Sequence, residues 1–171
     1  MTTKTKAFET KDALDLYKKI IYTEGKAGRR MDKKQIEEMI DLAIKQLGYS
    51  YAPYSHFHVG AALLAKNGTY YTGCNIENAA YGSSMCAERN AIYSAYCNGY
   101  HKEDIKQIAI VSFGNILVSP CGSCRQVMVE LLAKDCRVIL ANQNEYQITT
   151  VEELMPLAFK GDSLECSNQD L

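Results

Sequence analysis

The sequence predicts an α/β protein in which helices cover both faces of a mixed five-stranded sheet, a three-layer α/β/α sandwich. Helix-like and strand-like stretches alternate along the chain. Two strands are joined by a tight turn, and later strands are separated by segments long enough for helical crossovers. Crossovers of that length predict parallel strands beyond the hairpin. The 171 residues favour one principal domain.

The first helix of this domain is predicted over residues 32–48. Asp32 and Gln35 resemble a capping box at its start, and Gly48 supplies its stop. The apolar residues between these signals recur at helical spacing: Ile36, Met39, Ile40, Ala43, Ile44 and Leu47.

A hairpin and a second helix come next. Residues 59–65 and 69–75 are strand-like and are joined through the turn sequence at 66–68. A helix is predicted from about 86 to 98, before Gly99. The remaining elements are, in order, a buried strand at 105–112, a helix over 126–133 that opens just after 120–122, and strands at 137–141 and 146–150.

The C-terminal end of the domain carries one more helix signal. Thr150 and Glu153 resemble the capping box of a last short helix. Residues 31–160 are therefore predicted to form the folded domain and residues 161–171 a tail. Residues 1–30 are predicted to be an N-terminal extension, with a candidate short helix and a glycine-containing linker.

Composition and charge narrow the class of partner. Lys and Arg total 19 against 20 for Asp and Glu, a formal charge of -1. No global positive field therefore favours a nucleic acid or an anionic membrane. The longest nearly unbroken apolar stretch, 59–65, is far shorter than the roughly 18 residues of a membrane span. A small neutral partner fits this balance, with no nucleic acid and no membrane.

The cysteines indicate a reducing environment. Seven cysteines cannot all pair within one chain. The polar segment 1–12 lacks the apolar core of a secretory signal. We therefore expect a cytoplasmic protein whose thiols stay free or bind metal.

Two cysteine motifs carry the chemical information. Cys86-Ala87-Glu88 lies at a predicted helix start, and Pro120-Cys121-Gly122-Ser123-Cys124 opens a later helix. A Cys-x-x-Cys turn can direct two sulfurs at one zinc ion, and a helix N-terminus favours the thiolate form of Cys86 as a third ligand. Three thiolates would leave one tetrahedral position open, as in a catalytic zinc site. Glu88 is placed to accept and donate the proton of a water molecule there.

Other interpretations of the cysteines stay open at this point. Cys-x-x-Cys alone also occurs in redox pairs and in structural zinc sites. A redox pair is expected directly after an early strand, whereas this one opens a late helix. A structural site needs a fourth ligand, which Cys74, Cys97, Cys136 or a histidine would supply. Such a site would leave Glu88 without a role.

Several further segments occur together with these motifs, at 53–63, 73–81, 86–89, 119–126 and 151–156. In this order they resemble the small, three-cysteine class of zinc-dependent cytidine deaminases, over roughly residues 33–160. The signature of a ligand-x-Glu followed by Pro-Cys-x-x-Cys is met, with cysteine as the first ligand. The resemblance implies a cytidine deaminase-like fold and one zinc ion per chain.

The resemblance also implies roles at the metal. The zinc ligands would be Cys86, Cys121 and Cys124. Glu88 would shuttle protons. Arg89 and Gln126 would donate hydrogen bonds to the ligand sulfurs and so reduce their effective charge.

Further implied roles concern the nucleoside. Phe57 would stack on the pyrimidine, and the backbone N–H of Ala87 would bind its O2. Asn75 and Glu77 would hold the ribose 3′-hydroxyl, which agrees with strand geometry because residues two apart project from one face. In a homotetramer, neighbouring chains would complete each pocket through Tyr81 and Phe159.

The implied reaction is hydrolysis of cytidine and deoxycytidine to uridine and deoxyuridine, with release of ammonia, in pyrimidine salvage. Zinc would activate the attacking water. The chain departs from the family pattern at His58, where proline is common, and over 113–118, which could change what the pocket admits. Three alternatives are a nucleotide or polynucleotide deaminase, a deaminase of a cytosine-bearing antibiotic nucleoside, and a catalytically silent zinc-binding interaction module.

Overall fold

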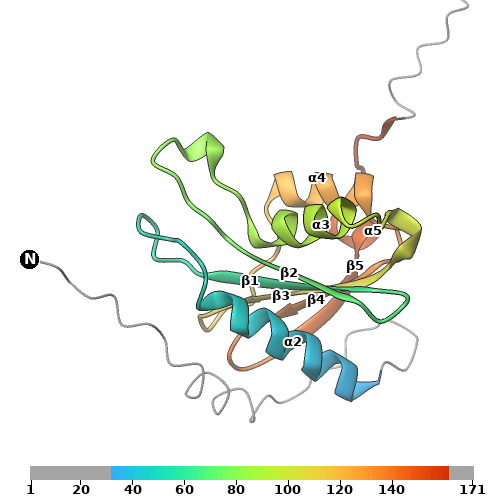
Figure 1. Ribbon diagram of the computed structural model, residues 1–171, viewed down its shortest axis with the longest axis horizontal. Coiled ribbons are helices and arrows are strands. Elements are labelled where there is room, and N and C mark those ends of the chain that lie inside the picture. The colour runs from blue at the N-terminus through green and yellow to red at the C-terminus, as the bar shows by residue number, and fades with distance from the viewer. Residues whose placement is uncertain (1–31, 162–171) are drawn as a thin grey trace, which may run out of the picture.

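The computed structural model describes residues 32–161, which form three layers around one sheet (Figure 1). The elements are α2 (Lys33–Leu47), β1 (Val59–Ala65), β2 (Tyr70–Cys74), η1 (Tyr81–Ser83), α3 (Ala87–Cys97), η2 (Lys102–Asp104), β3 (Ile105–Ser112), α4 (Gly122–Leu131), β4 (Arg137–Ala141), β5 (Tyr146–Thr150) and α5 (Val151–Leu154). The strand order is β2-β1-β3-β4-β5. Helix α2 covers one face of the sheet, and α3, α4 and α5 cover the other. The predicted mixed sheet and α/β/α sandwich are confirmed, whereas the helix expected within 1–30 lies outside the described residues.

The strand directions differ in part from the sequence expectation. β1 is antiparallel to both β2 and β3, β3 is parallel to β4, and β4 is antiparallel to β5. Among the strands of residues 32–161, parallel neighbours beyond the hairpin therefore occur only between β3 and β4. The α3 crossover passes over β1, so β2 and β3 run in the same direction with β1 between them. The short connection at 142–145 makes β4 and β5 a second hairpin.

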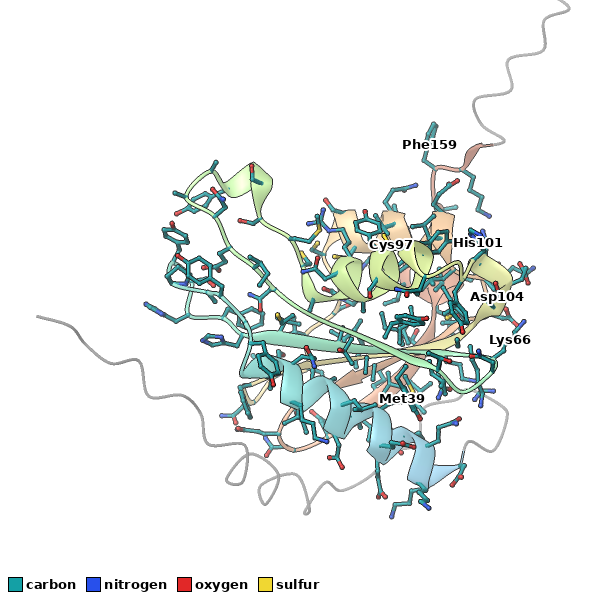
Figure 2. All side chains as sticks on the ribbon, in the orientation of Figure 1. Met39, Lys66, Cys97, His101, Asp104 and Phe159 are labelled. Atoms are coloured by element: carbon teal, nitrogen blue, oxygen red, sulfur yellow. The ribbon has the colours of Figure 1, made fainter. Side chains whose placement is uncertain are left out.

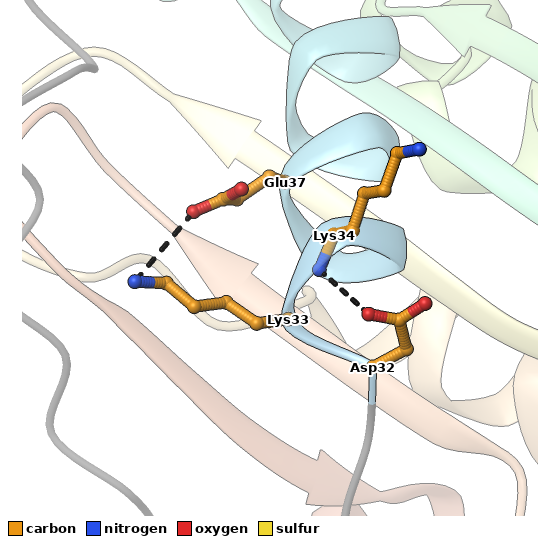
Figure 3. A network of polar contacts seen from close by, with 4 residues as sticks. All are labelled: Asp32, Lys33, Lys34 and Glu37. Carbon is orange, nitrogen blue, oxygen red and sulfur yellow. Dashed lines mark hydrogen bonds and ion pairs between the residues drawn. The ribbon is translucent and has the colours of Figure 1, made fainter.

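The capping box predicted at the start of α2 does not form; the Asp32 side chain binds the backbone N–H of Lys34 there (Figure 3). Asp32 does cap the helix, because its Oδ1 accepts a hydrogen bond from Lys34 N at 3.1 Å. The Gln35 side chain instead reaches β3, where its Oε1 accepts from Gln107 Nε2 at 3.3 Å. At the other end, Gly48 has φ -69°, so the helix stops there without the left-handed conformation that glycine permits.

The capping box predicted at the last helix does form. Thr150 Oγ1 accepts from Glu153 N at 3.2 Å, and Glu153 Oε2 accepts from Thr150 N at 2.9 Å. These two bonds satisfy N–H groups at the junction of β5 and α5. They fix the direction in which the chain leaves the sheet.

Two glycines let helices approach the sheet closely. A Cβ atom on Gly73 would lie 2.5 Å from Ala87 O and 2.6 Å from Ala91 N, both backbone atoms of α3. A Cβ atom on Gly60 would lie 1.9 Å from Ala43 O in α2. A Cβ atom at either glycine would overlap with the helix backbone, and a close-packed interior does not admit that overlap. Neither position therefore tolerates a side chain. The contact at Gly73 seats the first turns of α3 directly on β2.

Two apolar cores lie on the two faces of the sheet. Ala109 and Val111 of β3 pack in the core under α2, whereas Ile108 and Ile110 pack in the core under α3 and α4.

Within residues 32–161, no helix combines the length and the apolar character that a transmembrane span requires. The six cysteines of this range are free thiols.

Candidate active site and metal centre

The three predicted zinc ligands meet at the N-terminal ends of two helices. Cys86 is the N-cap of α3, and Cys121 is the N-cap of α4, whose first turn contains Cys124. Their three Sγ atoms lie within 4.8 Å of one another, and those of Cys86 and Cys121 are 3.9 Å apart. The positive ends of both helix dipoles favour thiolates at this point. The donor set therefore fits one zinc ion per chain.

Positive charge and hydrogen bonds stabilise the Cys86 thiolate. Cys124 lies within hydrogen-bonding reach of this sulfur, and Arg89 Nη2 donates to it at 3.6 Å. The two contacts lower the pKa of Cys86 to about 5, with the Cys124 hydrogen bond as the larger cause. Arg89 is itself held by a bond from Nη2 to the carbonyl of Ser84 at 3.4 Å. The guanidinium is thus placed to offset negative charge at the sulfur cluster.

Glu88 borders a cavity next to these sulfurs. The cavity has a volume of about 180 Å³, and Phe57, Ala87 and Glu88 line it together with Cys86 and Cys121. The Glu88 residue is only 5% exposed. Burial raises the pKa of its carboxyl group, and the neighbouring Cys86 thiolate raises it further. A carboxyl group that protonates readily can both accept and donate a proton.

A second cavity of about 430 Å³ adjoins the first, because Asn75 and Cys86 line both. Its other lining residues are Tyr54, Ser55, Ile76, Glu77, Tyr81, Ser84 and Met85. Lys and Arg do not occur in this set, and Glu77 contributes a carboxylate. The electrostatics favour an uncharged ligand over a phosphate.

Residues 33–140 match the family model described as the cytidine and deoxycytidylate deaminase zinc-binding region. The chain belongs to this family. It is 46% identical over 135 residues to the cytidine deaminase of Halalkalibacterium halodurans, covering 78% of this chain and 98% of that protein. It is 44% identical over 130 residues to the cytidine deaminase of Sporosarcina psychrophila, covering 75% and 94%. The crystal structure of cytidine deaminase from Burkholderia pseudomallei is similar with a TM-score of 0.71 and 42% identity, covering 75% of this chain and 100% of that one.

The matched family model is a zinc-binding region, so the described residues that are able to hold a metal decide where the ion would bind. Among residues 32–161, the group of side chains able to hold a metal consists of the three cysteines. Cys74, Cys97 and Cys136 are free thiols outside this group. The fourth protein ligand that a structural site requires is therefore not found in the described part of the chain.

The Asn75 side chain is engaged with the loop that precedes β1. Its Oδ1 accepts from Val59 N at 2.8 Å and from the Ser50 hydroxyl, and its Nδ2 donates to Phe57 O at 2.8 Å. β2 ends one residue earlier, at Cys74, so Asn75 follows the strand instead of lying within it. Asn75 thereby fixes the carbonyl of the residue predicted to stack on the base.

Glu77 holds the same loop at a second point. Its Oε2 accepts from Tyr54 N at 2.9 Å and from Ser55 N at 3.2 Å, and its Oε1 accepts from the Ser55 hydroxyl. These bonds lower the pKa of the Glu77 carboxyl group, and the bond from the Ser55 hydroxyl is the largest cause. Asn75 and Glu77 therefore share one task in the folded protein, which is to hold the loop that carries Phe57.

Three other predicted residues lie further out. Tyr81 is 75% exposed and lies edge-on to Tyr54, with ring centroids 6.0 Å apart. Phe159 is 57% exposed, and its ring points away from the domain (Figure 2). Gln126 Nε2 donates to Phe159 O at 2.9 Å. A bond from the Gln126 side chain to a ligand sulfur stays a prediction.

Two positioning residues were missed by the sequence analysis. Arg125 donates from Nε to Pro120 O at 2.8 Å and from Nη2 to Ser119 Oγ at 2.8 Å, and so closes the turn ahead of Cys121. No local sequence pattern predicts this role of Arg125. Ser55 is different, because its hydroxyl accepts a hydrogen bond from the backbone N–H of Phe57, two residues later. Serine often forms this kind of turn, so the residue type in the sequence is a signal for it.

Proposed function

We propose that this protein is a zinc-dependent hydrolase that deaminates cytidine and deoxycytidine to uridine and deoxyuridine. The observation that carries the proposal is the juxtaposition of three cysteine sulfurs with the buried Glu88 on one cavity. Residues Cys86, Cys121 and Cys124 would hold the ion. When bound, zinc supplies a Lewis acid that makes a water molecule acidic near neutral pH.

Glu88 is assigned the proton transfers. Its carboxylate takes one proton from the attacking water and delivers it to the ring nitrogen N3, while the water oxygen forms a bond to C4. It then carries the second proton of that oxygen to the amino group. The C4–N bond breaks, ammonia leaves, and the C4 carbonyl of uridine forms. The raised pKa of Glu88 supports both halves of this cycle.

The pyrimidine ring is assigned to the smaller cavity. Phe57 supplies an aromatic face there. Ala87 is the first residue of α3, and its N–H has no acceptor within the helix, so it is suited to bind the O2 of the base.

The bonding capacity of Asn75 and Glu77 supports a sugar hydroxyl in the larger cavity. An amide nitrogen has two N–H donors, and Asn75 uses one of them for Phe57. A carboxylate has about four acceptor positions, and Glu77 accepts three bonds from Tyr54 and Ser55. One donor and one acceptor position remain among the described contacts. A single hydroxyl group, which accepts and donates at once, matches this pair.

Assembly and cellular role belong to the same proposal. We infer a cytoplasmic homotetramer that acts in pyrimidine salvage, in which Tyr81 and Phe159 reach neighbouring chains. The high exposure of both aromatic side chains supports this assignment. Sedimentation of the purified protein tests the tetramer directly.

The reaction is tested by the loss of ultraviolet absorbance of cytidine, with ammonia measured in parallel. The purified protein should contain one zinc ion per chain and should turn over cytidine, whereas Glu88→Ala should bind zinc without turnover. Cytidine left intact by a protein whose zinc has four protein ligands would contradict the proposal and identify a silent binding module.

A substrate panel separates the remaining alternatives. Cytidine should react, and cytidine monophosphate and free cytosine should react poorly, because the larger cavity offers a hydroxyl site and a carboxylate in place of basic side chains. Faster turnover of the monophosphate would favour a nucleotide deaminase. Faster turnover of a cytosine nucleoside with a modified sugar would favour the antibiotic-nucleoside alternative.

A further inference from the structure

One hydroxyl group connects two residues of the proposed nucleoside site. Ser55 Oγ donates to Glu77 Oε1, and the same oxygen accepts from the backbone N–H of Phe57 at 3.0 Å. A serine hydroxyl can donate one hydrogen bond while it accepts another. Ser55 therefore joins the Glu77 carboxylate to the backbone of Phe57 through a single atom.

The backbone between these contacts is held in an uncommon conformation. His56 has φ 56°, in the left-handed region, where residues with a side chain are infrequent. Such a conformation persists where the surrounding contacts over-determine it. Ser55 holds the Phe57 N–H, and Asn75 holds the Phe57 carbonyl at 2.8 Å. The Phe57 side chain thus starts from a backbone fixed on both sides.

We propose that Ser55 is a positioning residue that couples the sugar side of the site to its base side, by transmitting the hydrogen bonding of Glu77 to the backbone of Phe57. The inference rests on the proposed function, because it takes Phe57 and Glu77 as the nucleoside contacts. Ser55 acts through these two residues and takes no part in the chemical step.

The charge of Glu77 gives this connection its strength. Its carboxylate also accepts from Tyr54 N at 2.9 Å and Ser55 N at 3.2 Å, and hydrogen bonds to an ionised acceptor are stronger than neutral ones. Hydrogen bonds in a chain polarise one another. A sugar hydroxyl that binds the remaining acceptor position of Glu77 therefore changes the bond that Ser55 makes to Phe57.

Amide hydrogen exchange at Phe57 and steady-state kinetics with cytidine test the coupling together. Ser55→Ala should speed exchange of the Phe57 amide and raise KM, each by about tenfold, as expected for the loss of one such hydrogen bond. The value of kcat should stay within about twofold, because the chemical step is untouched. Ser55→Thr keeps the hydroxyl and should restore both quantities. Ser94→Ala in α3 is the matched control and should behave as the wild type.

Glu77→Gln tests whether Ser55 transmits the state of Glu77. This change removes the charge from a residue that does not itself bond to the Phe57 N–H, yet it should speed exchange of that amide. In the double variant with Ser55→Ala and Glu77→Gln, the change in the free energy of exchange of the Phe57 amide should then be smaller than the sum of the changes in the two single variants.

Three results would each overturn the inference: a Phe57 amide that exchanges at the wild-type rate in Ser55→Ala, an unchanged KM in that variant, or strict additivity with Glu77→Gln. Circular dichroism verifies folding, and the exposed position of Ser55 makes the substitution mild. If the wild type does not turn over cytidine, the proposed function falls. The exchange comparison still decides whether Ser55 joins Glu77 to Phe57.

Discussion

Two regions border the Glu88 cavity, and they hold their functional side chains by different means. The cysteine cluster lies on secondary structure, with Cys86 and Cys121 at the N-caps of α3 and α4. Phe57 lies on an irregular loop whose backbone is held by the Asn75 and Glu77 side chains. Helix N-termini hold the side chains of the first region, whereas a few side-chain hydrogen bonds hold the backbone of the second. Substitutions should therefore abolish chemistry in the first region and adjust binding in the second.

The largest effect is expected from removing a metal ligand. Cys124→Ala should lose zinc and turnover together, because two thiolates do not complete the site. Metal analysis and the cytidine assay measure the two losses. Cys97→Ala, at an exposed cysteine of α3 outside the cluster, is the control and should keep both. Full zinc occupancy in Cys124→Ala would show that the ligand set is wrong.

Glu88→Gln should separate metal binding from proton transfer. The amide has nearly the same shape but cannot accept the proton, so turnover should fall by about 10²- to 10⁴-fold while zinc content stays at the wild-type level. Metal analysis of the same sample that is assayed makes the comparison direct. Wild-type turnover in this variant would remove the proton-transfer role of Glu88.

In the loop region, Asn75→Ala should chiefly weaken nucleoside binding. It removes the bonds to Val59 N and Phe57 O as well as the donor proposed for the sugar, so KM should rise by about tenfold or more, with a smaller change in kcat. Asn75→Asp keeps an acceptor for Val59 but loses the donors, which makes it the matched comparison. Michaelis behaviour equal to the wild type would count against the ribose contact.

The left-handed backbone at His56 offers a stability test. His56→Val should lower the free energy of unfolding by about 1–2 kcal/mol, because a β-branched residue fits φ 56° poorly. His56→Gly should stay near the wild-type stability, since glycine adopts this conformation freely but gains entropy in the unfolded chain. Urea denaturation measures both variants. Equal stability of the two would show that the left-handed conformation does not hold in solution.

The smallest effect concerns the titration of Glu77. Its folded-state pKa is lowered from 4.5, first by the Ser55 hydroxyl, so its bonds to the loop are present above that value and are lost as the pH falls through the lower folded value. The Coulombic interaction of Glu77 with His56 also lowers this pKa. A carbon NMR titration of the Glu77 carboxyl should give a midpoint below 4.5 in the wild type and a higher one in Ser55→Ala. A midpoint at or above 4.5 in the wild type would contradict the loop contacts.

The cysteine region was predictable from sequence because its signals are local. The two cysteine motifs coincide with helix starts, and the fold brings these starts to one point. Strand direction was only partly predictable, because the length of a connection does not tell which strand lies next to which. The role of Gln35 was missed for a similar reason, since its partner Gln107 belongs to a strand far along the chain.

The loop region was predictable in its residues but not in its contacts. Asn75 and Glu77 stand out through the family motif, yet their bonds to Val59 and Tyr54 join segments that no periodicity connects. The loop shows no helical or strand periodicity in its sequence. Its backbone groups are bound by side chains instead of by the backbone hydrogen bonds of a helix or strand. No local sequence pattern indicates that the same groups proposed to bind a sugar also hold the loop of an aromatic residue.

The C-terminal segment is fastened to the helical turn that carries Cys124. Arg125 Nη1 donates to Leu154 O at 3.2 Å, and Gln126 Nε2 donates to Phe159 O at 2.9 Å. A truncation upstream of residue 159 would remove the Phe159 carbonyl that Gln126 binds, close to the predicted metal ligand Cys124. Fusion partners and affinity tags at this end are therefore best joined beyond residue 161, where the anchoring carbonyls stay intact.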